Sequence, residues 1–264
     1  MLEEKEGSEN YFFIDSHAHI YLNDFDKDRQ EVIRRCVEEK VTKIYMPNLD
    51  HTSIDRMLET EHKNPKVCIP MIGLHPCYVK KGFERELYIV EDWLKNKKFA
   101  AIGEVGTDLH WDQSLLSLQQ EALKVQIGFA KKHHLPLVIH CRNSVKETIE
   151  VLKNSEAKLS GIFHCFSGTL EEAREVIEMG FLLGIGGVVT FKNSGLDKML
   201  EDLELKDLVL ETDCPYLTPA PHRKERNSPT YIPLIAQKVA AIKKISVKEV
   251  ADTTSANVLR IFKL

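Results

Sequence analysis

The chain has 264 residues, of which 43% are hydrophobic and 29% are charged, and its formal net charge is −4 at neutral pH. This acidic balance argues against a protein that coats nucleic acid through bulk electrostatics, because that mode of binding needs dense lysine and arginine surfaces. The sequence offers no uninterrupted apolar run of about 20 residues, the length that crosses a bilayer, so we expect no membrane span.

The N-terminal segment, MLEEKEGSEN, is acidic and polar, whereas a secretory signal needs basic residues followed by an apolar stretch. We therefore interpret residues 1–10 as a short flexible leader. Six cysteines are scattered along the chain without CxxC pairs, so we expect free thiols in a cytoplasmic protein. We interpret residues 1–264 as a single domain with no obligate protein partner.

Eight apolar runs of strand length occur in chain order: FFID (12–15), KIYMPN (43–48), VCIPMIGLH (67–75), FAAIGEVG (99–106), PLVIHC (136–141), GIFHCF (161–166), FLLGIGG (181–187) and LVLETDCP (208–215). Segments with helical spacing and charge lie between consecutive runs. One of them begins on Thr169 with Glu172 three residues on, which is the pattern of a capping box.

Near-continuous apolar runs flanked by helices predict parallel strands that are buried on both faces. Eight such units in about 250 residues predict an α/β fold, a single distorted (β/α)8 barrel of TIM type. An open doubly wound sheet is the alternative. The proline-rich stretch 218–233 would follow the eighth strand as an irregular loop, on the face where barrels of this type build their active sites.

Polar residues gather at the ends of these runs. In DSHAH (15–19), side chains alternate along the predicted strand, so His17 and His19 emerge on one side in chelating geometry. A pair of satisfied surface or core histidines fits this spacing equally well. The ends of the other runs favour the metal site, because they carry His75, Glu104, His140, His164 and Asp213.

These side chains supply enough nitrogen and oxygen ligands for two divalent ions. We expect two groups of ligands joined by Glu104: His17, His19 and Asp213 for one ion, and His140 and His164 for the other. Two ions about 3.5–4 Å apart polarise a phosphoryl or carbonyl oxygen and lower the pKa of a shared water. The mixed ligands suit Zn, Mn, Ni or Fe(II) better than Mg, which stays open as a further choice.

Neighbouring residues extend this candidate site. Asp15 and Glu211 each lie two residues before a proposed ligand, so alternation points them inward. An unpaired carboxylate there would be costly, and we expect both to accept hydrogen bonds from ligand histidines; a solvated turn position is the alternative. His75, Asp108 and Arg142 lie near the predicted mouth, where we expect substrate contacts, with Arg142 forming a forked hydrogen bond to phosphate; a hydrogen-bonded loop position is the alternative for each.

Several short motifs occur in a specific order and spacing: DSHAH (15–19), GLHP (73–76), GEVGTD (103–108), IHCR (139–142), HCFSG (164–168), ETDCPYL (211–217), PHRKERNSP (221–229) and TTSANVLRIF (253–262). Together they resemble the TatD family of metal-dependent deoxyribonucleases, a branch of the amidohydrolase-like barrels. The resemblance covers nearly the whole chain. It implies a TIM-type barrel, with the six proposed ligands at the family's metal-binding positions.

The resemblance also implies hydrolysis of phosphodiester bonds in DNA, as an exonuclease on single-stranded or 3′ ends, with Glu104 or Asp213 orienting the attacking water. Two positions depart from the family pattern: Thr107 stands in place of leucine in GExGLD, and Lys224 in place of the glycine of HRG. We expect Arg223 to make the substrate contact of this second loop. The alternatives are hydrolysis of a lactone, amide or small phosphoester on the same barrel, or a non-catalytic nucleic-acid-binding barrel.

Overall fold

Parallel strands form the centre of the protein, whose computed structural model describes residues 11–155 and 158–263. Within these residues the strands are β1 (Phe13–Asp15), β2 (Val41–Pro47), β3 (Cys68–Met71), β4 (Ile102–Asp108), β5 (Leu137–Arg142), β6 (Gly161–Phe163), β7 (Phe181–Ile185) and β8 (Leu208–Leu210). Each overlaps one of the apolar runs, so the strands predicted from the sequence are confirmed. The leader interpreted for residues 1–10 lies outside the described residues.

Hydrogen bonds order the strands into two parallel sheets, β1-β2-β3 and β4-β5-β6-β7-β8. A bridge between Ile72 and Ile102 joins the two sheets at β3 and β4, and the Gly103 nitrogen donates to the Ile72 oxygen over 2.9 Å. At the other edge, just after β1, the Ser16 nitrogen donates to the Leu210 oxygen of β8 over 3.0 Å. The two sheets therefore meet at both edges, which gives the distorted (β/α)8 barrel of TIM type that the sequence predicts.

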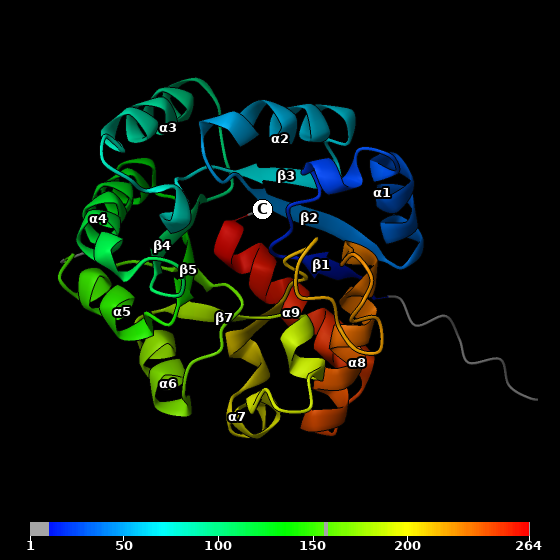
Figure 1. The fold of residues 1–264 in the computed structure, drawn as a ribbon. Coiled ribbons are helices and arrows are strands. Elements are labelled where there is room, and N and C mark those ends of the chain that lie inside the picture. The colour runs from blue at the N-terminus through cyan, green and yellow to red at the C-terminus, as the bar shows by residue number, and fades with distance from the viewer. Residues whose placement is uncertain (1–10, 156–157, 264) are drawn as a thin grey trace, which may run out of the picture.

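Helices surround the strands, and all but the last of them lie around the outside of the barrel, as Figure 1 shows. In chain order they are α1 (Arg29–Glu38), α2 (His51–Lys63), α3 (Glu84–Asn96), α4 (Leu116–His133), α5 (Val145–Lys153), α6 (Leu170–Glu178), α7 (Leu196–Asp202), α8 (Ile232–Lys243) and α9 (Val247–Phe262). Helix α6 begins with the predicted capping box, in which the Glu172 nitrogen donates to the Thr169 hydroxyl and the Thr169 nitrogen to the Glu172 carboxylate.

The interior of the barrel is apolar, and α9 closes one end of it. Each strand, or the residue directly beside it, contributes one buried side chain to an apolar layer: Ile14, Tyr45, Met71, Ala101, Val138, Ile162, Leu182 and Val209. These side chains pack against Val258, Ile261 and Phe262 of α9. The Ser255 hydroxyl donates to the Phe12 oxygen over 3.0 Å and the Asn257 amide to the Leu208 oxygen over 2.8 Å. These contacts lie at the amino ends of β1 and β8, and Figure 1 shows α9 across the middle of the barrel. The open end is therefore the one where the carboxyl ends of the strands meet.

The outward faces of the strands pack beneath the helices, where Phe13, Ile44 and Leu137 belong to the larger core. Burial on both faces explains why the runs are almost continuously apolar. No helix among the described residues has the length and apolar character needed to cross a bilayer.

Gly106 lets β4 approach β5 unusually closely. Its φ is +145°, and a Cβ added there would lie 1.9 Å from the His140 carbonyl oxygen. Any larger residue would clash at this point and would adopt a backbone conformation that L side chains avoid. The glycine therefore helps bring Glu104 of β4 beside His140 of β5, at the open end of the barrel.

Candidate metal centre

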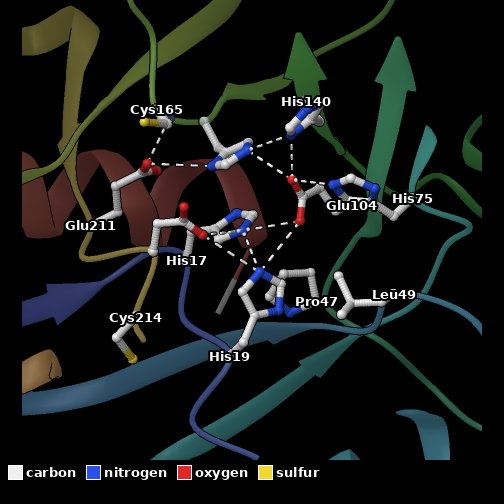
Figure 2. A network of polar contacts seen from close by, with 12 residues as sticks. His17, His19, Pro47, Leu49, His75, Glu104, His140, Cys165, Glu211 and Cys214 are labelled. Atoms are coloured by element: carbon white, nitrogen blue, oxygen red, sulfur yellow. Dashed lines mark hydrogen bonds and ion pairs between the residues drawn. The ribbon is translucent and has the colours of Figure 1, made fainter. Parts of the chain in front are cut away.

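Glu104 lies at the centre of a polar cluster at the open end of the barrel, and Figure 2 shows the imidazoles around it. Its side chain is 2% exposed. Oε2 lies 3.3 Å from His17 Nε2 and 3.4 Å from His19 Nε2. Oε1 lies 2.8 Å from both His140 Nδ1 and His164 Nε2. One carboxylate oxygen of Glu104 therefore faces each of the two histidine pairs.

Asp213 joins the first of these pairs from the loop after β8. Its Oδ1 lies 3.6 Å from His17 Nε2 and 3.5 Å from His19 Nε2. The residue has a φ of 55°, in the left-handed region that aspartate tolerates better than most side chains. Its nitrogen donates to the His17 oxygen over 2.9 Å. This hydrogen bond holds the turn in which the carboxylate faces the two imidazoles.

The donor atoms of this cluster fit a divalent cation. Among the described residues, Glu104 Oε2 and His17 Nδ1 are buried without a hydrogen-bond partner, and an unpaired buried carboxylate oxygen is costly. The ligand atoms of His17, His19 and Glu104 lie within 4.8 Å of one another, close enough to share one ion. Imidazole nitrogens and carboxylate oxygens are ligands that Zn, Mn, Ni and Fe(II) accept. A bound cation would satisfy the oxygen that the protein leaves unpaired.

Tyr21 sets the tautomer of His19. The Tyr21 hydroxyl donates to the Pro47 carbonyl over 2.6 Å, and its oxygen lies 3.0 Å from His19 Nδ1. A carbonyl can only accept, so the Tyr21 oxygen is left to accept from the His19 Nδ1–H. The Nε2 lone pair of His19 then faces Glu104, as a metal ligand requires. Tyr21 was not predicted from the sequence, although its place two residues after His19 was a usable signal.

We expect Tyr21→Phe to weaken the binding of a divalent ion about 10–100-fold, because His19 loses the acceptor that holds its ring. Phenylalanine fills nearly the same volume, so the barrel should stay folded. Tyr45→Phe is the matched control, since the Tyr45 hydroxyl is buried without a hydrogen-bond partner among the described residues. Competition with a chromogenic zinc chelator measures both affinities, and equal affinities in the two variants would contradict the role of Tyr21.

A carboxylate lies beside each histidine of the second pair. His140 Nε2 lies 2.8 Å from Asp108 Oδ2, which leaves Nδ1 facing the centre of the cluster. His164 Nδ1 lies 3.5 Å from Glu211 Oε1, and the same oxygen accepts from the Cys165 nitrogen over 2.6 Å. Glu211 thus lies beside a proposed ligand, where the sequence placed it. The carboxylate of Asp108 is placed to orient His140; the substrate contact of Asp108 stays a prediction.

Asp15 contacts backbone rather than an imidazole. Its carboxylate accepts from the His17 nitrogen over 3.2 Å, from the Thr212 nitrogen over 3.0 Å and from the Thr212 hydroxyl over 2.5 Å. Asp15 thus accepts from a ligand histidine, as predicted, but from the backbone of His17 and not from its ring. Asp15 therefore ties the segment after β1, which carries the first histidine pair, to the segment after β8, which carries Asp213.

His75 is placed to donate a hydrogen bond rather than to bind metal. Its Nδ1 accepts from the Cys77 nitrogen over 3.0 Å, so the neutral ring carries its proton on Nε2. Nε2 lies 3.4 Å from Glu104 Oε1, and His75 lines the cavity above it. His75, Glu104 and His140 lie close enough together to share an ion, but a protonated Nε2 offers no lone pair. This geometry supports the predicted substrate contact of His75.

Burial and charge crowding set the protonation states of the cluster. Burial opposes the charge on Glu104, but the surrounding imidazoles, His164 foremost, outweigh it and hold the pKa of Glu104 well below its ordinary value. Burial likewise opposes the charge on Asp213, yet the nearby imidazoles, His19 foremost, lower the pKa of Asp213. Burial lowers the pKa of His17, which leaves this ring neutral and able to act as a ligand.

A cavity of about 580 Å³ opens above the cluster, and Arg142, from the end of β5, lines its wall. Arg223 lies elsewhere: its guanidinium carbon sits 3.5 Å from the centroid of the Phe191 ring, and it is not among the residues that line this cavity. The position of Arg142 therefore supports a contact at the mouth, whereas the substrate contact of Arg223 stays a prediction.

Buried histidines and carboxylates at the carboxyl ends of barrel strands define the class of metal-dependent hydrolases built on the amidohydrolase-like barrel. The sequence matches the family described as TatD related DNase over residues 14–263. The chain belongs to this family, as its motifs indicated.

Individual relatives agree with this assignment. YabD from Bacillus subtilis, described as an uncharacterized metal-dependent hydrolase, is 37% identical over 252 residues, which cover 95% of this chain and 98% of that protein. The structure of the TatD homologue YjjV from Escherichia coli matches with a TM-score of 0.90 and 26% identity, over 96% of this chain and 98% of that one. A lactonase from Listeria monocytogenes, with a TM-score of 0.66 and 13% identity over 94% of each chain, shares the fold alone. The protein is a metal-dependent hydrolase of the TatD family.

Proposed function

We propose that this protein is a deoxyribonuclease that hydrolyses phosphodiester bonds, acting as an exonuclease on single-stranded or 3′ ends of DNA. The observation that carries the proposal is the placement of Glu104, whose two carboxylate oxygens face separate histidine pairs. In two-metal phosphatases and nucleases, the two ions stabilise the attacking and the leaving oxygen of an in-line displacement. A carboxylate that faces both groups of ligands suits this arrangement. Membership of a family described as TatD related DNase supports DNA as the substrate.

The ligands that we propose form two groups around Glu104: His17, His19 and Asp213 for one ion, and His140 and His164 for the other. When bound, divalent ions supply Lewis acidity, which polarises a phosphoryl oxygen and lowers the pKa of water. Zn, Mn, Ni or Fe(II) suits this nitrogen-rich set, and Mg is the further choice.

The protein's own groups then move the proton and bind the phosphate. Asp213 accepts a proton from the attacking water at Oδ2, since its Oδ1 faces the first histidine pair and its lowered pKa keeps it ionised. The water oxygen bonds to phosphorus while the bond to the leaving sugar oxygen breaks, and solvent supplies a proton to that oxygen. His75 Nε2–H and the Arg142 guanidinium donate to the phosphate oxygens, where negative charge increases.

The free cysteines and the net charge of the protein indicate its cellular location and how it binds DNA. All six cysteines are free thiols, the state that the cytoplasm maintains, so we place the protein there. Its net charge of −4 gives DNA little general attraction. Binding of DNA is then confined to the mouth of the cavity and weakens as salt is added.

Metal removal tests this proposal. We expect the metal-stripped protein to leave single-stranded DNA intact, and stepwise shortening to return when Mg, Mn or Zn is added separately. The active ion should also raise Tm, because an ion present at 100 times its Kd adds about 2.7 kcal/mol to the free energy of unfolding. Gel analysis of the products and a thermal scan measure the two effects.

Two further substrates separate the alternatives. A lactone and a small phosphodiester are assayed in parallel with the DNA, under the same metal conditions. Inert DNA with a cleaved lactone would contradict DNA hydrolysis while leaving the metal centre in place. Metal binding without hydrolysis of any of the three would favour a non-catalytic barrel.

A further inference from the structure

Aromatic side chains gather at the mouth of the metal-site cavity. The described residues include eight exposed large hydrophobic side chains, and four of them line this cavity: Tyr78, Trp111, Tyr216 and Leu217. Trp111 is the most exposed of all, at 73%. Exposed apolar side chains that are scattered singly need no explanation, but a group of them around one cavity marks a binding surface.

The loop that carries Trp111 is anchored to the metal centre. Asp108 Oδ1 accepts from the His110 nitrogen over 2.8 Å and from the Trp111 nitrogen over 3.4 Å, while its Oδ2 contacts His140. The Arg142 guanidinium carbon lies 5.9 Å from the centroid of the Trp111 ring. The exposed face of Trp111 and the Arg142 cation thus lie side by side. Asp108 connects this loop to His140, a proposed metal ligand.

A second hollow adjoins the metal-site cavity at Trp111. It has a volume of about 320 Å³ and shares four of its lining residues with the metal-site cavity: Cys77, Tyr78, Asp108 and Trp111. Asp112, Leu115 and Gln119 complete its lining. Tyr78 and Trp111 therefore lie on the boundary between the two hollows, where a ligand that spans both would contact them.

We infer that Trp111, together with Tyr78 and Arg142, forms a stacking subsite for one unpaired nucleobase next to the phosphate that is cleaved. This inference rests on the proposed function. Stacking on an aromatic side chain accepts every base, because every base has a π face, and it is used where nucleic acid is bound without sequence preference. Arg142 is placed to hold the phosphate of the same nucleotide by a forked hydrogen bond.

The subsite explains how an acidic protein selects its substrate. With a net charge of −4, the protein cannot rely on general attraction to phosphate for affinity. A base inside a duplex has both faces covered by its neighbours, whereas an unpaired terminal base is free to stack on Trp111. Single-stranded ends would therefore be bound in preference to internal duplex positions.

The chain contains two tryptophans, Trp93 and Trp111, so fluorescence can isolate the subsite. Trp93 lies in α3, partly buried against the core, and Trp93→Phe leaves Trp111 as the reporter. We expect thymidine 5′-monophosphate to quench the fluorescence of metal-loaded Trp93→Phe protein, and inorganic phosphate not to. In Trp111→Phe protein, where Trp93 is the reporter, the nucleotide should cause no quenching. Quenching that persists in Trp111→Phe, or that phosphate alone produces equally, would overturn the subsite.

The second measurement compares the kinetics on a normal single strand with those on a strand whose terminal nucleotide lacks its base. We expect Trp111→Ala to raise KM for a single-stranded DNA about tenfold, with kcat within about twofold of wild type. A strand whose terminal nucleotide lacks its base should show no change, and Trp111→Phe should restore most of the affinity for the normal strand. Equal losses on both strands would mean that Trp111 only shapes the loop, which would overturn the inference. If the protein hydrolyses DNA but substitution of Trp111 has no effect, the subsite alone is refuted. If neither hydrolysis nor quenching is observed, the proposed function is refuted as well.

Discussion

Glu104→Gln should lower kcat/KM for single-stranded DNA by about a thousandfold or more. Glutamine keeps the size and shape of the side chain but removes the charge that faces both histidine pairs. Neither group of ligands would then bind its ion as the wild type does, so the metal content per chain should also fall. Hydrolysis assays and elemental analysis of the purified variant measure the two losses.

The barrel itself should survive this substitution, because the apolar layer that α9 completes does not include Glu104. Circular dichroism and gel filtration check that the fold is kept. Glu201→Gln, at an exposed position in α7, is the matched control and should behave as wild type. A Glu104→Gln protein with wild-type hydrolysis and metal content would refute the bridging role of Glu104.

The fold could be predicted because its signals are local and repeated along the chain. Each strand lies within or beside an apolar run, and Thr169 with Glu172 marks the start of α6 by capping chemistry. The ends of the strands were harder to predict. β6 ends at Phe163 and β8 at Leu210, short of the runs that indicate them. Cys165 and Asp213, with φ of 46° and 55°, turn out of the strand conformation there.

Because the site residues lie beyond the strand ends, strand alternation predicts the directions of their side chains only in part. His17 and His19 lie beyond β1, which ends at Asp15, so the pleat of a strand is not what brings them together. Their Nε2 atoms nevertheless lie 3.3 Å apart, as the prediction of a histidine pair requires. The carboxylate of Asp15 shows where the extrapolation failed, because it accepts from backbone and from Thr212 instead of from a ring.

Some hydrogen bonds between distant segments were not predicted. The Tyr21 hydroxyl reaches a carbonyl 26 positions along the chain, and Asp108 reaches an imidazole 32 positions away. Such pairs depend on how closely neighbouring strands approach, which a single sequence does not record. Residue type and position at a strand end thus identified the candidate ligands and Glu211 beside one of them, whereas the contacts of Tyr21 and Asp108 with ligand histidines required the structure.

Asp213→Asn should lower kcat by about 10²–10⁴-fold with little change in KM, which is the loss expected when a proton acceptor is removed. Asparagine is the right replacement because it tolerates the left-handed φ of 55° at this position. The lowered pKa of Asp213 keeps its carboxylate ionised at neutral pH, whereas a carboxamide does not take up a proton there. Steady-state kinetics on single-stranded DNA at saturating metal measure the change.

Asp213 also faces His17 and His19, so its loss could act through metal binding instead. A metal titration of the Asp213→Asn variant separates the two roles, because excess ion compensates for a weakened ligand but cannot replace a proton acceptor. We expect the loss of kcat to persist at saturating metal, and Asp55→Asn, at an exposed position in α2, to match wild type throughout. Full recovery with excess metal would assign Asp213 to metal binding alone, and Glu104 would then be the remaining carboxylate among the proposed ligands that could accept the proton.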